Sequence, residues 1–303
     1  MTAQPLNITA AVKTTPPQNR QSSASSVMAR RNRLPEILSR LKSLSPAQIE
    51  KIYARAIRHQ EPFGKAAIHL GLATTKDVKA ALAIQFGYHF DKSENVKVPP
   101  ALIAVAQPFS DMAEAFRLLR TELLTTNNGD GARLVSIAGA GPGTGSSLVA
   151  ANLAISFAQL GRRTLLVDAR LRNPQQAKLF ATSAQYGLED LIDGTAELAD
   201  ALAPCCIRNL SLLAAPTKSH DPQAVLSSQA FAHFIGEASH QFDSVVIDTT
   251  TGTKVADGRY VWALTKSVLL VARKNNSRVD DLRKITRHIQ ACGAHAVGTV
   301  MMG

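Results

Sequence analysis

A glycine-rich loop between an apolar strand and an Ala-rich helix is the feature of this 303-residue sequence that most restricts its fold. The run RLVSIA at residues 133–138 leads into GAGPGTGSSL, and an apolar stretch at residues 147–160 follows at once. Glycines free the backbone to point N–H groups into a concavity at a helix N-terminus, and such a concavity binds anions. The sequence therefore predicts a strand, a loop and a helix that together hold phosphate.

Short β-branched runs alternate with helical patterns from Ser110 onward, which is typical of a parallel sheet with helices on both faces. The predicted fold class is α/β, a doubly wound and mainly parallel sheet preceded by a small all-helical domain. The strands are expected at residues 133–138, 163–168, 210–215, 242–248, 267–272 and 296–302. The helices between them are expected to begin near Ser146, Pro222, Ala256 and Arg278.

Composition divides the chain into four segments. Residues 1–33 are rich in Ser, Thr, Gln, Pro and Ala without apolar periodicity, so we expect a disordered basic tail. Residues 34–90 carry helix signals, such as Ser45 followed by Pro46 and Gln48, and are predicted to form the small helical domain. The prolines and charges of residues 91–108 indicate a linker, and residues 109–303 are assigned to the α/β domain.

The loop is close to the motif G-x-x-x-x-G-K-[ST], with Ala140 at the first glycine and Ser146 at the lysine. Two apolar strands end in Asp168 and Asp248, as metal-assisted phosphate chemistry requires. Ser147 keeps the hydroxyl that ligates magnesium in the motif, so the candidate magnesium ligands are Ser147, Asp168 and Asp248. The candidate phosphate contacts are Gly141, Gly143, Thr144, Gly145, Ser146 and Ser147.

These motifs resemble those of the bacterial tyrosine kinases, which are P-loop NTPases of the MinD and ParA type. The stretch LVSIAGAGPGTGSSLVAANLAISFAQLGRRTLLVDARLRNP is similar to their Walker A and second Walker region, and FDSVVIDTTTGTKVADG is similar to their Walker B strand. The resemblance covers roughly residues 108–303. It implies ATP or ADP with Mg²⁺ as ligands, Asp168 and Asp248 as catalytic carboxylates, and Arg172 as a further nucleotide-binding residue.

The departures from this family concentrate on nucleotide chemistry. Ser146 replaces the phosphate lysine and Arg170 replaces the second aspartate of D-x-D; Thr250, Thr251 and Met302 stand at other altered positions. Losing one preorganised donor at such a site costs about 100- to 1000-fold in rate. We therefore expect weak or absent binding of ATP, ADP and Mg²⁺ and an impaired kinase. The sequence ends at Gly303, so the family's tyrosine-rich tail is expected to be absent.

The run MAEAFRLLRTEL places Glu114, Arg117 and Arg120 in the pattern E-x-x-R-x-x-R. We expect their side chains to share one helical face, and the resemblance implies that this face mediates ring assembly with other copies or with a kinase paralogue. An ordinary exposed ion-pair helix is the alternative.

The stretch EPFGKAAIHLGLATTKDVKAALAIQ resembles the N-terminal helical domain of type II secretion ATPases, some of which bind cyclic di-GMP through glycine-containing repeats. Gly64, Gly71, Leu82 and Gln85 match the repeat, whereas Pro62 stands where it has arginine. Because no second full copy precedes it, a packing or docking module is favoured over a ligand site.

Three functions remain open at this point. The favoured one is a regulatory or scaffolding protein of exopolysaccharide biosynthesis and export that docks on a membrane polysaccharide co-polymerase. The alternatives are an active tyrosine autokinase of polysaccharide chain-length control and a MinD- or ParA-like ATPase. No apolar run reaches the length of a membrane span and no signal-peptide core is present, so a cytoplasmic protein is expected. The net charge of +11, partly in the first forty residues, favours either contact with the acidic inner-membrane surface or a solvated tail; a nucleic-acid partner is not expected.

Overall fold

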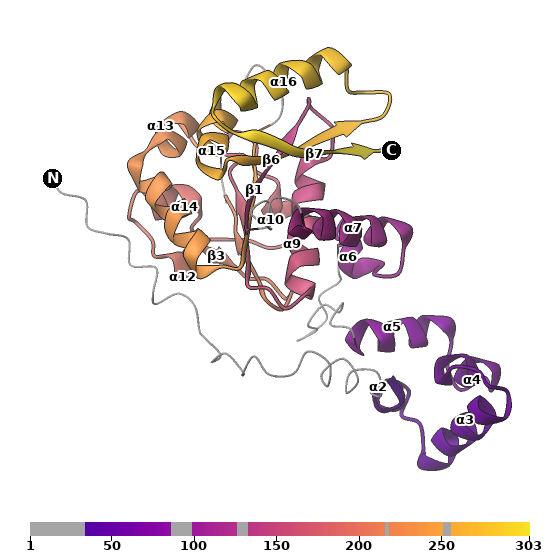
Figure 1. Cartoon of the computed structure of the whole chain (residues 1–303). Helices are drawn as coiled ribbons and strands as arrows, with labels where there is room; N and C mark the ends of the chain where they lie inside the picture. The colour runs from indigo at the N-terminus through magenta and orange to yellow at the C-terminus, as the bar shows by residue number, and fades with distance from the viewer. Residues whose placement is uncertain (1–33, 86–98, 126–132, 216–217, 251–255) are drawn as a thin grey trace. The chain divides into compact units, whose positions relative to one another are not determined.

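A computed structural model describes residues 34–85, 99–125, 133–215, 218–250 and 256–303 of the chain (Figure 1). The chain divides near residue 90 into two compact units, one helical and one α/β. The predicted disordered tail, residues 1–33, lies outside the described residues.

The helical unit consists of four short helices around a small apolar core. They are α2 (Leu34–Lys42), α3 (Pro46–Arg58), α4 (Phe63–His69) and α5 (Thr75–Gln85). The capping box predicted for α3 is confirmed, because the N–H of Gln48 donates to Ser45 Oγ and the N–H of Ser45 donates to Gln48 Oε1. A Cβ added at Gly64 would lie 2.7 Å from Val78 Cγ1, so α4 and α5 approach too closely there for a side chain. This glycine has a packing role.

The α/β unit is built on one seven-stranded sheet in the order β3-β4-β2-β5-β1-β6-β7 (Figure 1). All neighbouring strands run parallel except β3, which pairs antiparallel with β4. The predicted fold class is confirmed. The strands are β1 (Leu134–Gly139), β2 (Thr164–Asp168), β3 (Leu202–Ala203), β4 (Leu210–Leu213), β5 (Ser244–Asp248), β6 (Ser267–Arg273) and β7 (His295–Met302).

Helices cover both faces of this sheet. Leu165 of β2 is buried against α14, and because successive strand residues point to opposite faces, Leu166 is buried on the other side, where α9 packs.

Among the helices of the described residues, none has the length and apolar character needed to span a bilayer. The helices are α6 (Ile103–Ala106), α7 (Asp111–Thr125), α9 (Ser146–Gln159), α10 (Gln176–Leu179), α11 (Leu188–Ile192), α12 (Leu198–Ala201), α13 (Pro222–Ser227), α14 (Gln229–Gln241), α15 (Asp257–Thr265) and α16 (Val279–Ala291).

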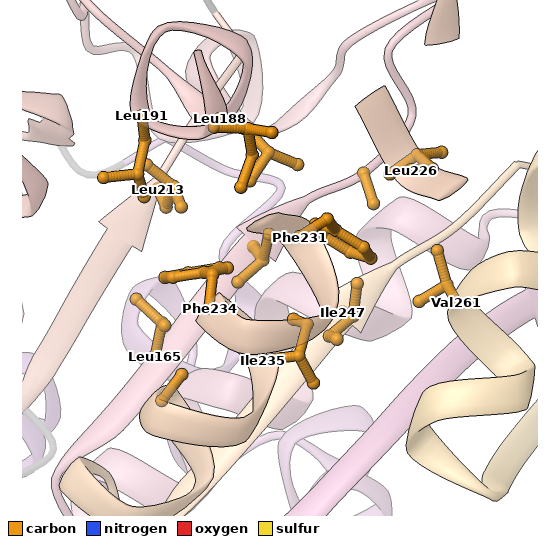
Figure 2. Packing of buried hydrophobic residues seen from close by; sticks show 14 of the residues in the cluster. Leu165, Leu188, Leu191, Leu213, Leu226, Phe231, Phe234, Ile235, Ile247 and Val261 are labelled. Carbon is orange, nitrogen blue, oxygen red and sulfur yellow. The ribbon is translucent and has the colours of Figure 1, made fainter. Parts of the chain in front are cut away.

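The largest apolar core lies between the sheet and α11, α13, α14 and α15. Figure 2 shows Phe231 and Phe234 of α14 beside Leu165 of β2 and Ile247 of β5, all of them fully buried. The two strands that end in the candidate carboxylates are therefore held by the same cluster. The position of Asp168 and Asp248 depends on this packing.

The structure differs from the predicted boundaries in two places. Of the predicted linker 91–108, the part up to residue 98 lies outside the described residues, but the next part forms α6 and packs on α9. There the N–H of Ala104 donates to Asn152 Oδ1 at 2.9 Å. The helix expected from Pro222 is divided, because Ser228 adopts an extended backbone and caps α14 by accepting the N–H of Phe231.

Candidate functional site

The candidate site lies at the carboxyl ends of three adjacent parallel strands, β2, β5 and β1. The final residues of β2 and β5, Asp168 and Asp248, are direct partners in the strand register. Strand β1 continues into the glycine-rich loop, and α9 begins at Ser146 as predicted. In an open α/β sheet, this edge is where ligands bind.

The loop is held in shape from several sides. Gly143 and Gly145 have φ values of 73° and 85°, a left-handed backbone that side chains disfavour. Arg273 Nη1 donates to the Gly143 carbonyl at 2.9 Å, and Asn276 Nδ2 donates to the Pro142 carbonyl at 3.2 Å. The hydroxyl of the buried Thr144 is used inside the loop, since it donates to the carbonyl of Gly141 at 3.1 Å. These bonds fix the orientation of three carbonyls of the loop. They favour a preformed anion cradle, which is the geometry that phosphate requires.

The guanidinium of Arg170 contacts the hydroxyls of Ser146 and Ser147, the first two residues of α9. Arg170 follows β2 by two residues, and its Nη1 donates to Ser147 Oγ at 3.0 Å and lies 3.5 Å from Ser146 Oγ. Both serines are almost completely buried. The cation therefore contacts both positions at which the sequence motif is expected to handle phosphate and metal.

The two carboxylates behind the loop are fully buried and differ in their hydrogen bonds. Asp168 accepts the backbone N–H groups of Gln175 and Gln176, each at 2.8 Å, and that of Arg170 at 3.1 Å. Asp248 accepts Gln176 Nε2 at 2.8 Å, whereas its Oδ1 has no hydrogen-bond partner among the described residues.

Their pKa values follow from this surrounding. Burial raises the pKa of Asp168 against the opposing effect of its backbone hydrogen bonds. Burial and then the charge of Asp168 raise the pKa of Asp248 to about 7, because two carboxylates at adjacent strand ends disfavour each other's ionisation. The guanidinium of Arg170 acts in the other direction on both.

Gln176 is a site residue that sequence reasoning missed. Its buried amide donates to the Ser147 carbonyl at 3.1 Å as well as to Asp248, and so joins the start of α9 to the end of β5. It opens the four-residue helix α10, which is too short to show a helical period. No local signal in the sequence separates this glutamine from neighbouring Gln175.

In the structure, Arg172 pairs with Asp257, which does not belong to the glycine-rich loop. Its Nε donates to Asp257 Oδ2 at 2.6 Å and its Nη2 donates to Asp257 Oδ1 at 3.0 Å. This bidentate pair raises the pKa of Arg172 and ties the segment after β2 to the first turn of α15. The nucleotide-binding role predicted for Arg172 remains a prediction, and the observed role is a structural one.

Magnesium does not fit this arrangement, although the three predicted ligands Ser147, Asp168 and Asp248 do lie together. Magnesium binds oxygen at about 2.0–2.1 Å, and the oxygen of Ser147 already accepts a hydrogen bond from the guanidinium of Arg170. A dication about 4 Å from a guanidinium is repelled by about 8 kcal/mol at an effective dielectric constant near 20.

The three residues predicted to mediate assembly do not share one exposed face of α7. Glu114 is exposed and pairs with Arg117, whose Nη2 lies 2.6 Å from Glu114 Oε2 and whose Nη1 donates to the Pro108 carbonyl. Arg120 is buried, and its Nη1 donates to the carbonyl of Ser156 in α9 at 3.0 Å. The expectation for Arg120 is therefore wrong in its geometry, because this residue joins α7 to α9.

No family model matches the chain. It is 28% identical over 197 residues to the putative tyrosine-protein kinase CapB of Staphylococcus aureus, which covers 64% of this chain and 86% of that protein. It is 31% identical over 199 residues to the putative tyrosine-protein kinase EpsB of Ralstonia solanacearum, of which it spans only 26%.

The chain is also similar to a solved structure. The crystal structure of the chimerical protein CapA2B2 is 28% identical, covers 76% of this chain and 98% of that one, and superposes with a TM-score of 0.63. Two observations support this similarity. One is the parallel sheet described above, and the other is sequence identity that extends over about two thirds of the chain. Over about two thirds of its length, the chain is therefore similar to bacterial tyrosine-protein kinases.

Proposed function

We propose that this chain is a regulatory or scaffolding P-loop protein of exopolysaccharide biosynthesis or export, and that its phosphate site does not support metal-assisted phosphoryl transfer. The observation that carries the proposal is the guanidinium of Arg170 on the hydroxyl of Ser147. In the P-loop motif this hydroxyl binds magnesium, and the preceding residue, here Ser146, is a lysine. The proposal joins the homology with tyrosine-protein kinases to a site in which both of these functions are altered.

Phosphoryl transfer requires positive charge beside the departing phosphoryl group. In the P-loop mechanism a lysine and a magnesium ion neutralise charge that develops on the γ-phosphate. Ser146 carries no charge, and Arg170 is one cation where the motif has one monovalent and one divalent cation. Removing one such preorganised donor costs about 100- to 1000-fold in rate, so losing the metal as well would leave little catalysis.

The chain is expected to form no phosphotyrosine when it is incubated with ATP and magnesium. Tyr53 and Tyr260 have exposed fractions of 46% and 40%, so acceptor side chains are accessible. Mass spectrometry of the treated protein measures the result, with an active tyrosine kinase of the family as the positive control. Phosphotyrosine on wild type that disappears in Asp248→Asn would show an active autokinase and overturn the proposal.

The proposed partners are a membrane polysaccharide co-polymerase and other copies of the chain or a kinase paralogue. Glu114 is more than half exposed, and with Arg117 it offers a charged pair on the outside of α7. Leu118 of the same helix has an exposed fraction of 60%, which places apolar surface beside the pair. This combination supports a contact surface at α7. Contact of the basic tail with the inner-membrane surface stays a prediction on residues outside those described.

Glu114→Ala is expected to weaken self-association or association with a kinase paralogue, because it removes the exposed carboxylate while leaving the packed side of α7 unchanged. Sedimentation velocity measures the effect, and circular dichroism checks the fold. Arg120→Ala serves as a comparison that should lower stability instead, since it removes the bond to Ser156. A wild-type chain that stays monomeric at tens of micromolar (an order-of-magnitude choice for a weak interface), alone and with the co-polymerase's cytoplasmic segment, would disprove assembly through this helix.

A further inference from the structure

The guanidinium of Arg170 lies at the two positions where the P-loop motif has a lysine and a magnesium ion. Arg170 Nη1 lies 3.0 Å from Ser147 Oγ and 3.5 Å from Ser146 Oγ. In the P-loop motif these two positions serve the metal and the lysine, respectively. Arg170 thus supplies a positive charge at the start of α9. The backbone N–H groups at this helix start also favour an anion.

The position of Arg170 is set by the chain around it. Its backbone N–H donates to Asp168 Oδ1 at 3.1 Å, and the carboxylates of Asp168 and Asp248 lie behind its charge. Its Nε is buried and has no hydrogen-bond partner among the described residues. An arginine carries five N–H donors, so this side chain holds donor capacity that the two serines do not use.

We propose that the loop binds the polyphosphate group of a nucleoside di- or triphosphate as the metal-free anion, with Arg170 as the neutralising cation. The inference rests on the proposed function, because it identifies the ligand of the same altered site. An arginine binds phosphate through paired, charge-assisted hydrogen bonds. A magnesium ion carried by the ligand would be repelled by the same guanidinium. Binding should therefore be strongest where magnesium is removed.

The test is calorimetry of the full chain with ADP and with pyrophosphate, each in EDTA and in excess magnesium. Both probes share the polyphosphate chemistry, so binding of both assigns the affinity to the loop, and binding of ADP alone adds a contribution from the nucleoside. We expect binding in EDTA and several-fold weaker binding in magnesium. AMP, which lacks a polyphosphate, should bind more weakly than ADP.

Arg170→Ala should weaken binding in EDTA about 10- to 100-fold, the loss of charge-assisted hydrogen bonds to phosphate. Arg170→Lys keeps the charge without the planar fork and should lose less, which separates charge from misfolding. Arg283→Ala is the matched control, because the Arg283 side chain is 72% exposed on α16 and pairs only weakly with Asp280 at 3.5 Å. It should bind as wild type does.

Three results would overturn the inference: binding that requires magnesium, equal binding by Arg170→Ala, or no binding of either probe in either buffer. The last result would leave the scaffolding role standing. Phosphotyrosine formation would instead overturn the scaffolding role, so the two failures are distinguishable.

Discussion

The double variant Ser146→Lys with Arg170→Asp is expected to gain magnesium-dependent ADP binding, about 10- to 100-fold tighter than the wild-type chain shows in magnesium, as charge-assisted hydrogen bonds to phosphate would give. The lysine supplies a cation to the phosphates, and the aspartate removes the guanidinium from Ser147 Oγ. The guanidinium of Arg170 would then no longer repel a metal ion beside Asp168 and Asp248. Calorimetry in magnesium and in EDTA measures the change.

Ser146→Lys alone should give little or no gain. The new ammonium would lie near the guanidinium of Arg170, which is 3.5 Å from the Ser146 hydroxyl, and two cations at such a distance repel each other. Arg170→Asp alone separates the two contributions and completes the cycle. If the single lysine variant bound magnesium and ADP as tightly as the double variant, Arg170 would not be the residue that excludes the metal.

Leu165→Ala is expected to lower the free energy of unfolding by about 2–5 kcal/mol, because it leaves a cavity in a closely packed core. Leu165 is fully buried on β2 and lies beside Phe234 (Figure 2). Urea denaturation followed by circular dichroism measures the change for the α/β unit.

Leu118→Ala is the matched control, since the same atoms are removed from a side chain whose exposed fraction is 60%. Such a surface change should stay within about 0.5 kcal/mol. Equal destabilisation by the two variants would contradict the packing described for β2 and α14.

Much of the fold follows from local signals in the sequence. The six predicted strands occur within a few residues of their expected limits. Strands β1, β2, β5 and β6 are nearly continuous buried runs, as is typical of a parallel sheet, whereas the edge strand β7 is largely exposed or half-buried. Helix starts at Ser146 and Pro222 agree with the prediction. Glycine, proline and capping residues set these limits through backbone geometry alone. The short elements β3, α10, α11 and α12 were missed, since two to five residues show no period.

The assembly residues show where spacing misleads. Each helical residue advances about 100° around the axis, so Arg120 lies about 120° from Glu114 and not above it. That rotation turns Arg120 toward α9, where Ser156 accepts its hydrogen bond. The spacing rule holds for Glu114 and Arg117, three residues apart, which do form the pair.

The residues of the candidate site were identified in the sequence, but their contacts with one another were not. The sequence identified the loop, Ser147 and both aspartates as candidates, and it showed Arg170 in place of an aspartate of D-x-D. The contact of Arg170 with Ser147 joins residues 23 positions apart in the chain, and only the packing of β2 beside α9 brings them together. The same reason explains why Gln176 was missed, since its partner Asp248 is 72 positions away.

The central claim is that an arginine, and not a metal ion, supplies the positive charge at the loop. Electron paramagnetic resonance of Mn²⁺, a substitute for magnesium, tests it most directly on the wild-type chain with ADP. For the wild-type chain with ADP we expect no protein-bound Mn²⁺ signal, and a larger signal of free Mn²⁺ where the protein withdraws metal-free ADP; a protein-bound signal is expected only in Ser146→Lys with Arg170→Asp. A broadened, protein-bound Mn²⁺ signal in the wild-type chain would contradict it.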